Sequence, residues 1–214
     1  MKKTILFDLD GTLIDTSEGI LNSIEKTIKD LLLQEKNRDE LISFIGPPLQ
    51  GAFEEIYGLD KYRAEEAVSV FRKHYKSEDM LICKPYDGIE ELLTTLKRQG
   101  MKLFVATSKP TEFAIQILNN FGLYDYFEQV VGSNIDNTRI SKAEVIQFIL
   151  DNYSVSDTVI MVGDKAQDLI GASKTHVSAI GVTYGFGTRE ELLEESSVAI
   201  VDSVDDLLKT LLEE

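Results

Sequence analysis

The sequence predicts an α/β protein in which helices cover both faces of a parallel sheet and a small all-helical unit follows the first strand. Short apolar runs rich in β-branched residues recur along the chain, and helical patterns separate most of them. Such alternation is typical of a parallel sheet enclosed by helices. The long stretch after the first run shows helical periodicity and no strand pattern, and it therefore predicts an insertion.

Six apolar runs are the candidate strands. They lie at residues 4–7, 102–107, 129–131, 158–162, 178–182 and, more weakly, 198–201. Helical periodicity covers residues 88–99, 112–121, 142–151, 168–174 and 204–212. Ligands of parallel sheets bind at the carboxyl ends of the strands, so the residues directly after these runs are the candidates for a functional site.

Residues 16–83 form the predicted helical unit. One apolar stripe runs through Ile20, Ile24 and Ile28, and a second runs from Ala64 to Tyr75. A Gly-Pro-Pro turn at residues 46–48 separates them, because proline cannot continue a helix. We therefore expect a discontinuous core domain of residues 1–15 and 84–214, and a helical cap domain of residues 16–83.

Charge and cysteine content restrict the possible partners and compartment. The 214 residues include 22 Lys and Arg against 37 Asp and Glu, which gives a net charge of −15. A field of that sign repels polyanions, so we expect no nucleic-acid polymer and no membrane as partner. A single cysteine, Cys83, and the lack of a secretory signal pattern predict a cytoplasmic protein. No surface stripe calls for a second copy, so we expect a monomer.

The segment Asp8-Leu9-Asp10-Gly11-Thr12 carries the strongest functional signal. Residues two apart on a strand share a face, so both carboxylates can point into one site. Two acids at the end of a buried strand repel each other and lose hydration, a cost that a bound cation or catalysis would justify. The alternative is an ordinary solvated Asp-Gly turn.

A second acidic pair follows the run at 158–162. Asp164 comes directly after it, and Asp168 lies one helical turn later. Together with Asp8 and the Asp10 backbone carbonyl, these residues offer the hard oxygen ligands that suit Mg²⁺. Asp164 could alternatively serve only as a helix N-cap.

Hydroxyls and cations complete the set. Thr107, Ser108 and Lys109 follow the run at 102–107 and precede a helix, where hydroxyl and backbone N–H groups bind phosphate. Lys142 begins another helix. Each of these residues alone could be a helix cap or a surface lysine, but their order along the chain is informative.

In that order the chain resembles the haloacid dehalogenase superfamily of aspartate-nucleophile phosphatases, whose core is Rossmann-like. The matching positions are Asp8-Leu9-Asp10-Gly11-Thr12, Ser108, Lys142, and Gly163-Asp164 with Asp168. The helical insertion after the first motif also matches. The Gly-Pro-Pro-Leu segment at 46–49 and the Ala-Thr-Ser-Lys-Pro segment at 106–110 are similar to the phosphoglycolate phosphatase and bacterial 5′-nucleotidase-like branch.

The resemblance implies a Mg²⁺-dependent hydrolase of a small phosphorylated metabolite, of the phosphoglycolate or nucleoside 5′-monophosphate type. Asp8 would attack phosphorus to form an aspartyl phosphate, and Asp10 would act as general acid and then general base. Ser108 and Lys142, helped by Thr107 and Lys109, would hold the phosphoryl oxygens. Mg²⁺ would bind Asp8, Asp10 through its carbonyl, and Asp164, with Asp168 contributing directly or through water.

Substrate choice is assigned to the cap. We expect Gly46 and Pro47, in the stiff turn above the phosphate site, to contribute to specificity, with the chain's two passages between core and cap acting as hinges.

Other activities stay open at this point. Dehalogenation also uses an aspartate nucleophile but needs no metal, which would leave Asp10, Asp164 and Asp168 without a role. A sugar-phosphate mutase of the β-phosphoglucomutase type needs the same core. A non-catalytic phosphoaspartate signalling module would combine similar residues, but Asp10 would hydrolyse its phosphoaspartate quickly.

Overall fold

The computed structural model describes residues 3–134 and 138–213, and a parallel sheet forms its centre. The six strands lie in the order β5-β4-β1-β6-β7-β8, and every pair is parallel. Their bounds are β1 Lys3–Phe7, β4 Lys102–Pro110, β5 Gln129–Ser133, β6 Thr158–Gly163, β7 Ser178–Val182 and β8 Ala199–Val201. The predicted strands are thus confirmed.

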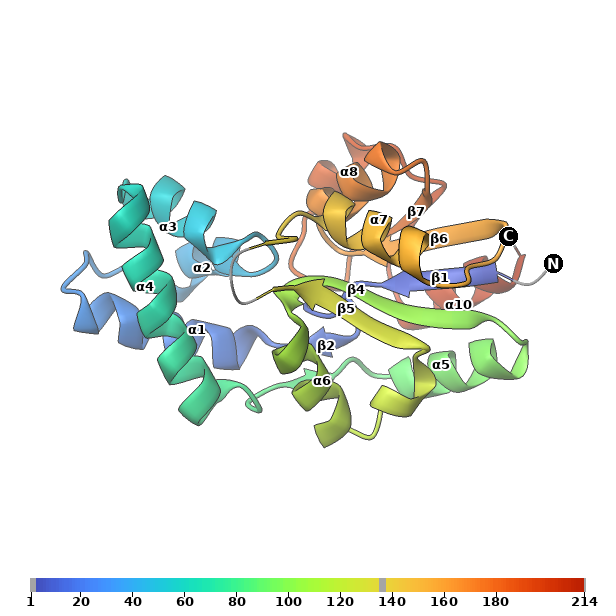
Figure 1. Cartoon of the computed structure of the whole chain (residues 1–214), viewed down its shortest axis with the longest axis horizontal. Coiled ribbons are helices and arrows are strands. Elements are labelled where there is room, and N and C mark those ends of the chain that lie inside the picture. The colour runs from blue at the N-terminus through green and yellow to red at the C-terminus, as the bar shows by residue number, and fades with distance from the viewer. Residues whose placement is uncertain (1–2, 135–137, 214) are drawn as a thin grey trace.

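Helices cover both faces of the sheet. The helices outside the insertion are α5 Ile89–Arg98, α6 Thr111–Asn120, α7 Lys142–Asn152, α8 Ala166–Lys174, α9 Arg189–Leu193 and α10 Val204–Glu213, with the short turn η3 Tyr124–Tyr126. On β1, Ile5 and Phe7 pack into one apolar cluster and Leu6 into the other. Figure 1 shows α7 and α8 on one side of the sheet and α5 and α6 on the other. The predicted α/β class is confirmed.

A helical insertion stands between β2 (Ile14–Asp15) and β3 (Lys84–Pro85), which pair antiparallel as a short ribbon. Its elements are α1 Ser17–Asp30, α2 Arg38–Leu41, η1 Ile42–Phe44, α3 Leu49–Tyr57, α4 Lys61–His74 and η2 Tyr75–Asp79. Figure 1 shows these helices beside the sheet, near the end where β1 and β4 finish. We call these elements the helical insertion; the ribbon at its base was not predicted, because two-residue strands leave no periodicity to detect.

The strand order determines where a ligand can bind. From β1 the chain moves to β4 and β5 on one side, and then returns to β6, β7 and β8 on the other. The order therefore reverses between β1 and β6, and open α/β sheets bind ligands at such a switch point, beyond the carboxyl ends of the strands. Asp8 follows β1 and Asp164 follows β6, so both acids stand at that point.

Apolar packing also joins the sheet to the helical insertion. One continuous cluster of buried side chains extends from Ile5 and Phe7 through Leu9 and Leu13 to Ile24 of α1. The segment that carries Asp8 and Asp10 therefore packs against apolar side chains of both the sheet and the helical insertion. Within residues 3–134 and 138–213, no helix combines the length and apolar character that a membrane span requires.

Candidate active site

Three carboxylates meet at the switch point. Oxygen atoms of Asp8, Asp164 and Asp168 all lie within 4.8 Å of one another, and all three residues are buried. The backbone N–H of Asp8 donates to the carbonyl of Val162 at 2.9 Å, which fixes the end of β1 against β6. The structure thus brings together the acids that the sequence places after two different strands.

Burial and neighbouring charge raise the pKa values of two of these acids, Asp8 and Asp164. Burial raises the pKa of Asp8 to about 6; the Lys142 charge opposes this rise, and the charges of Asp168 and Asp10 add to it. Burial, followed by the charges of Asp168 and Asp8, holds the pKa of Asp164 well above its ordinary value. Negative charge in this cluster is therefore only partly compensated by the protein.

Lys142 supplies that partial compensation. Its Nζ lies 2.7 Å from Oδ1 of Asp8 and 2.7 Å from Oδ1 of Asp168, and it donates to the carbonyl of Ala106 at 3.0 Å. Burial favours the neutral amine, but the charges of Asp168 and Asp8 raise the pKa of Lys142 above its ordinary range. A capping box between Ser141 and Glu144 begins the helix that carries this lysine.

Asp10 belongs to a separate cluster. Its Oδ1 lies 2.9 Å from Nζ of Lys109 and accepts a hydrogen bond from the hydroxyl of Thr16 at 2.7 Å. The Lys109 ammonium also stands 4.9 Å from the centre of the Tyr75 ring, which belongs to the helical insertion. Lys109, predicted to hold phosphate, thus pairs with Asp10 in this structure. Sequence reasoning missed both residues, because Thr16 lies just beyond the segment at residues 8–12 and Tyr75 was interpreted only as part of an apolar stripe.

The two hydroxyls at the end of β4 differ in surroundings. Thr107 is buried and its Oγ1 accepts a hydrogen bond from the backbone N–H of Lys109 at 3.2 Å. Ser108 is half-buried and lines a cavity together with Asp10. Both hydroxyls lie at the same sheet edge as Asp8, a position that is compatible with phosphate binding. Phosphate binding by Ser108 and Thr107 stays a prediction.

A glycine-rich loop after β7 encloses Asp164 and was not predicted. The backbone N–H of Phe186 donates to Oδ2 of Asp164 at 2.7 Å, and the hydroxyl of Thr12 donates to Oδ1 at 3.4 Å. A Cβ on Gly185 would lie 2.5 Å from the Asp164 side chain, and one on Gly187 would lie 1.9 Å from its carbonyl oxygen. Only glycine allows this approach. The Gly-Phe-Gly sequence two residues after a strand was the available signal.

Both oxygens of Asp168 already have partners. Oδ1 lies beside Lys142, and Oδ2 accepts from the backbone N–H of Lys165 at 3.1 Å. A Cβ on Gly163 would lie 2.2 Å from Oδ2 of Asp168, so this carboxylate is held tightly between β6 and α8. Asp168 is therefore placed to orient Lys142 as well as to face a cation.

Gly46 and Pro47 line the same cavity as Asp10 and Ser108. Gly46 has φ of +105°, and a Cβ at this position would lie 3.0 Å from Cγ of Lys165. The turn of the helical insertion thus reaches the core beside Asp164. The structure brings these two residues to the site, while their role in specificity stays a prediction.

The acidic cluster fits a hard divalent cation. Its donors are carboxylate oxygens, which Mg²⁺ prefers. Lys142 pairs with two of the three buried carboxylates, Asp8 and Asp168. Burial and the neighbouring acidic charges raise the pKa values of Asp8 and Asp164. A divalent cation would offset the remaining negative charge. Asp8, Asp164 and, directly or through water, Asp168 are the residues that would hold it.

Comparison with known proteins agrees with this site. Residues 5–182 match the family described as haloacid dehalogenase-like hydrolase. A 5′-nucleotidase of Pseudomonas aeruginosa is 43% identical over 189 residues, which cover 88% of this chain and 86% of that protein. A phosphoglycolate phosphatase of Aquifex aeolicus is 34% identical over 86% of each chain.

A solved structure is similar over the full length. The crystal structure of a predicted phosphatase from Clostridium acetobutylicum superposes with a TM-score of 0.97 at 44% identity, and the match covers 100% of both chains. The family match spans β1 to β7 and includes every acidic residue of the site. The chain therefore belongs to the haloacid dehalogenase-like hydrolases.

Proposed function

We propose that this hydrolase is a Mg²⁺-dependent phosphomonoesterase that acts on a small phosphorylated metabolite through an aspartyl phosphate on Asp8. The convergence of Asp8, Asp164 and Asp168 on one buried point, with Lys142 between two of them, carries the proposal. The names of relatives, among them 5′-nucleotidase and phosphoglycolate phosphatase, support phosphate-ester chemistry. Bound Mg²⁺ would neutralise charge on the phosphoryl oxygens.

Asp8 is the nucleophile in this proposal. Lys142 holds its Oδ1 at 2.7 Å, which fixes the orientation of the carboxylate. One carboxylate oxygen bonds to phosphorus while the bond from phosphorus to the leaving oxygen breaks. Lys142 and a hydroxyl at the end of β4 stabilise the phosphoryl oxygens during this transfer.

Asp10 moves the protons. Lys109 and Thr16 both hold its Oδ1, so Oδ2 is the oxygen that would carry the proton. Asp10 gives this proton to the departing alkoxide and then takes one from a water molecule. That water attacks the phosphorus of the aspartyl phosphate, releases inorganic phosphate and regenerates the Asp8 carboxylate.

Chelation is the first test of this proposal. Hydrolysis of 4-nitrophenyl phosphate should proceed with Mg²⁺, stop in excess EDTA and return when Mg²⁺ is restored. Steady-state release of nitrophenol measures the effect. Turnover that is equal with and without EDTA would contradict the proposal, and so would halide release from a 2-haloacid in EDTA.

Mg²⁺ should also stabilise the folded protein. Binding at a concentration of 100 times Kd adds about 2.7 kcal/mol to the free energy of unfolding, and a calorimetric scan would detect this as a rise in Tm. The pKa of Asp8 is raised to about 6, so protons compete with the metal below that pH. We therefore expect a larger rise in Tm at pH 8 than at pH 5.

A matched pair of variants separates this effect from general ionic stabilisation. Asp164→Asn should lose the Mg²⁺-dependent rise in Tm, while Asp87→Asn, at an exposed position, should retain it. An equal rise in both variants would place the metal elsewhere.

A further inference from the structure

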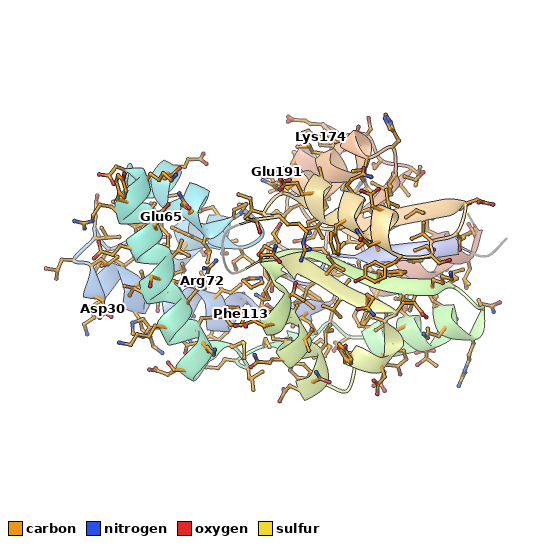
Figure 2. All side chains as sticks on the ribbon, viewed as in Figure 1. Asp30, Glu65, Arg72, Phe113, Lys174 and Glu191 are labelled. Carbon is orange, nitrogen blue, oxygen red and sulfur yellow. The ribbon has the colours of Figure 1, made fainter. Side chains whose placement is uncertain are left out.

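A partly open cavity lies between the helical insertion and the carboxyl edge of the sheet. Its volume is about 110 Å³, and Asp10 and Ser108 form part of its lining. Figure 2 shows Arg72 of α4 and Phe113 of α6 near each other at the boundary between the insertion and the sheet. Because Asp10 is the proposed proton donor to the leaving oxygen, a leaving group bound during the reaction must enter this cavity.

Aromatic rings form part of the cavity wall. Phe71 and Tyr75 of the insertion stack with ring centres 5.3 Å apart, and Tyr75 meets Phe113 of the core edge-on at 5.9 Å. All three rings are at most 4% exposed, and Val68 and Ile20 add aliphatic surface. A ring placed among these side chains would gain both apolar burial and edge-to-face contacts.

The cations of the cavity already have acidic neighbours. Lys109 pairs with Asp10 at 2.9 Å. Burial lowers the pKa of Arg72, and the nearby Glu112 acts in the opposite direction. A carboxylate on the leaving group would have to lose its hydration among aromatic walls and compete with these acids for a cation. The cavity therefore disfavours a small anionic leaving group such as glycolate.

Size gives a second constraint. A cavity of about 150 Å³ lined by Leu, Ile and Phe in another protein binds benzene, so a volume of about 110 Å³ is on the scale of a single ring. A nucleoside would place a polar ribose, and not its aromatic base, next to the phosphate. The space directly beyond Asp10 is therefore matched to a single apolar ring close to the ester oxygen.

We propose that the preferred substrates are phosphomonoesters whose leaving group carries one compact apolar ring close to the ester oxygen. This inference rests on the proposed function and departs from both substrate types that the sequence predicts. The structural basis is the Phe71, Tyr75 and Phe113 enclosure next to Asp10.

The test compares substrates whose leaving groups are all primary alcohols, so that binding and not leaving-group reactivity dominates. We expect kcat/KM for benzyl phosphate to exceed that for 2-phosphoglycolate and for a nucleoside 5′-monophosphate by about 100-fold, on the scale of one buried ring. Acetyl phosphate is a separate reference and not an alcohol ester: it is a mixed anhydride whose acetate leaving group needs no proton from Asp10 and is too small to fill the cavity, so its hydrolysis reports phosphoryl transfer itself.

Filling the cavity should remove the preference. Val68→Phe places a ring inside the cavity and should lower the ratio of kcat/KM for benzyl phosphate to that for acetyl phosphate at least 10-fold. Ser69→Phe is the control, because Ser69 is the next residue of α4, is exposed and does not line the cavity. Should Val68→Phe fail to fold, as judged by its Tm, Val68→Leu makes a smaller addition and should lower the ratio in the same direction.

Each outcome decides a different claim. A kcat/KM for phosphoglycolate or the nucleotide that equals or exceeds that for benzyl phosphate would overturn the inference, while acetyl phosphate hydrolysis would leave the proposed function standing. An unchanged ratio in both Val68 variants would also overturn it. No hydrolysis of acetyl phosphate with Mg²⁺ present would refute the proposed function, and the inference with it.

Discussion

Asp8→Asn should reduce kcat by at least about 10⁴-fold, because an amide is a poor nucleophile and a poor metal ligand. The fold should survive this change. The amide oxygen can still accept from Lys142, which lies 2.7 Å from Oδ1 in the wild type. Asp87→Asn, the same substitution at an exposed site, should leave kcat unchanged. If Asp8→Asn retained more than a few per cent of wild-type kcat, Asp8 would not be the nucleophile.

Asp8→Asn should also change how the free energy of unfolding depends on pH. Burial raises the pKa of Asp8 in the folded state to about 6, from 3.8. The folded state therefore binds this proton more tightly than the unfolded state, and metal-free wild type loses stability as pH rises between about 4 and 6. Asp8→Asn lacks this titration, so its free energy of unfolding should fall less over that interval. Urea unfolding at several pH values in EDTA measures the difference.

Lys142→Met should damage both stability and activity. Its ammonium contacts Asp8 and Asp168, each at 2.7 Å, inside a buried site. Removing one partner of a buried ion pair leaves uncompensated charge and costs about 3–5 kcal/mol. Loss of a cation from the phosphoryl site should lower kcat by about 10²–10³-fold.

Two observations distinguish this loss from a general packing defect. The destabilisation should shrink as pH falls below about 6, where Asp8 becomes protonated, and it should shrink when Mg²⁺ supplies positive charge. Lys174→Met, at an exposed position on α8 that Figure 2 labels, should change neither Tm nor kcat. A Lys142→Met protein with wild-type Tm in EDTA would show that the cluster does not depend on this charge.

The acidic residues of the site could be predicted because each lies in a short, local sequence pattern. Asp8 and Asp164 each follow an apolar run, and a parallel sheet brings the ends of such runs to one edge. Lys142 follows a capping signal, Ser141 with Glu144 three residues later. These patterns span a few residues each, so the sequence alone was sufficient to predict the strands, the sheet class and the candidate acids.

Contacts between distant segments could not be predicted. Phe186 donates to Asp164 from 22 residues away, and Tyr75 meets Lys109 across the boundary between the insertion and the sheet. Which partner a buried lysine finds depends on packing, and Lys109 lies beside Asp10, although the sequence predicts a phosphate contact. The exact division into core and cap domains and the monomeric state stay predictions.

An aspartyl phosphate on Asp8 should be trapped in the Asp10→Asn variant. This variant lacks the base that activates water, so the phosphoryl group should accumulate on Asp8. The variant is mixed with acetyl phosphate and Mg²⁺, and the reaction is quenched in acid. Intact-protein mass spectrometry then measures the mass of the protein. We predict a gain of one phosphoryl group that fragmentation maps to Asp8, and no gain in EDTA or in a variant that also carries Asp8→Asn. A wild-type enzyme that hydrolyses acetyl phosphate while the Asp10→Asn protein never gains mass, or gains it at another residue, would show that Asp8 is not the nucleophile.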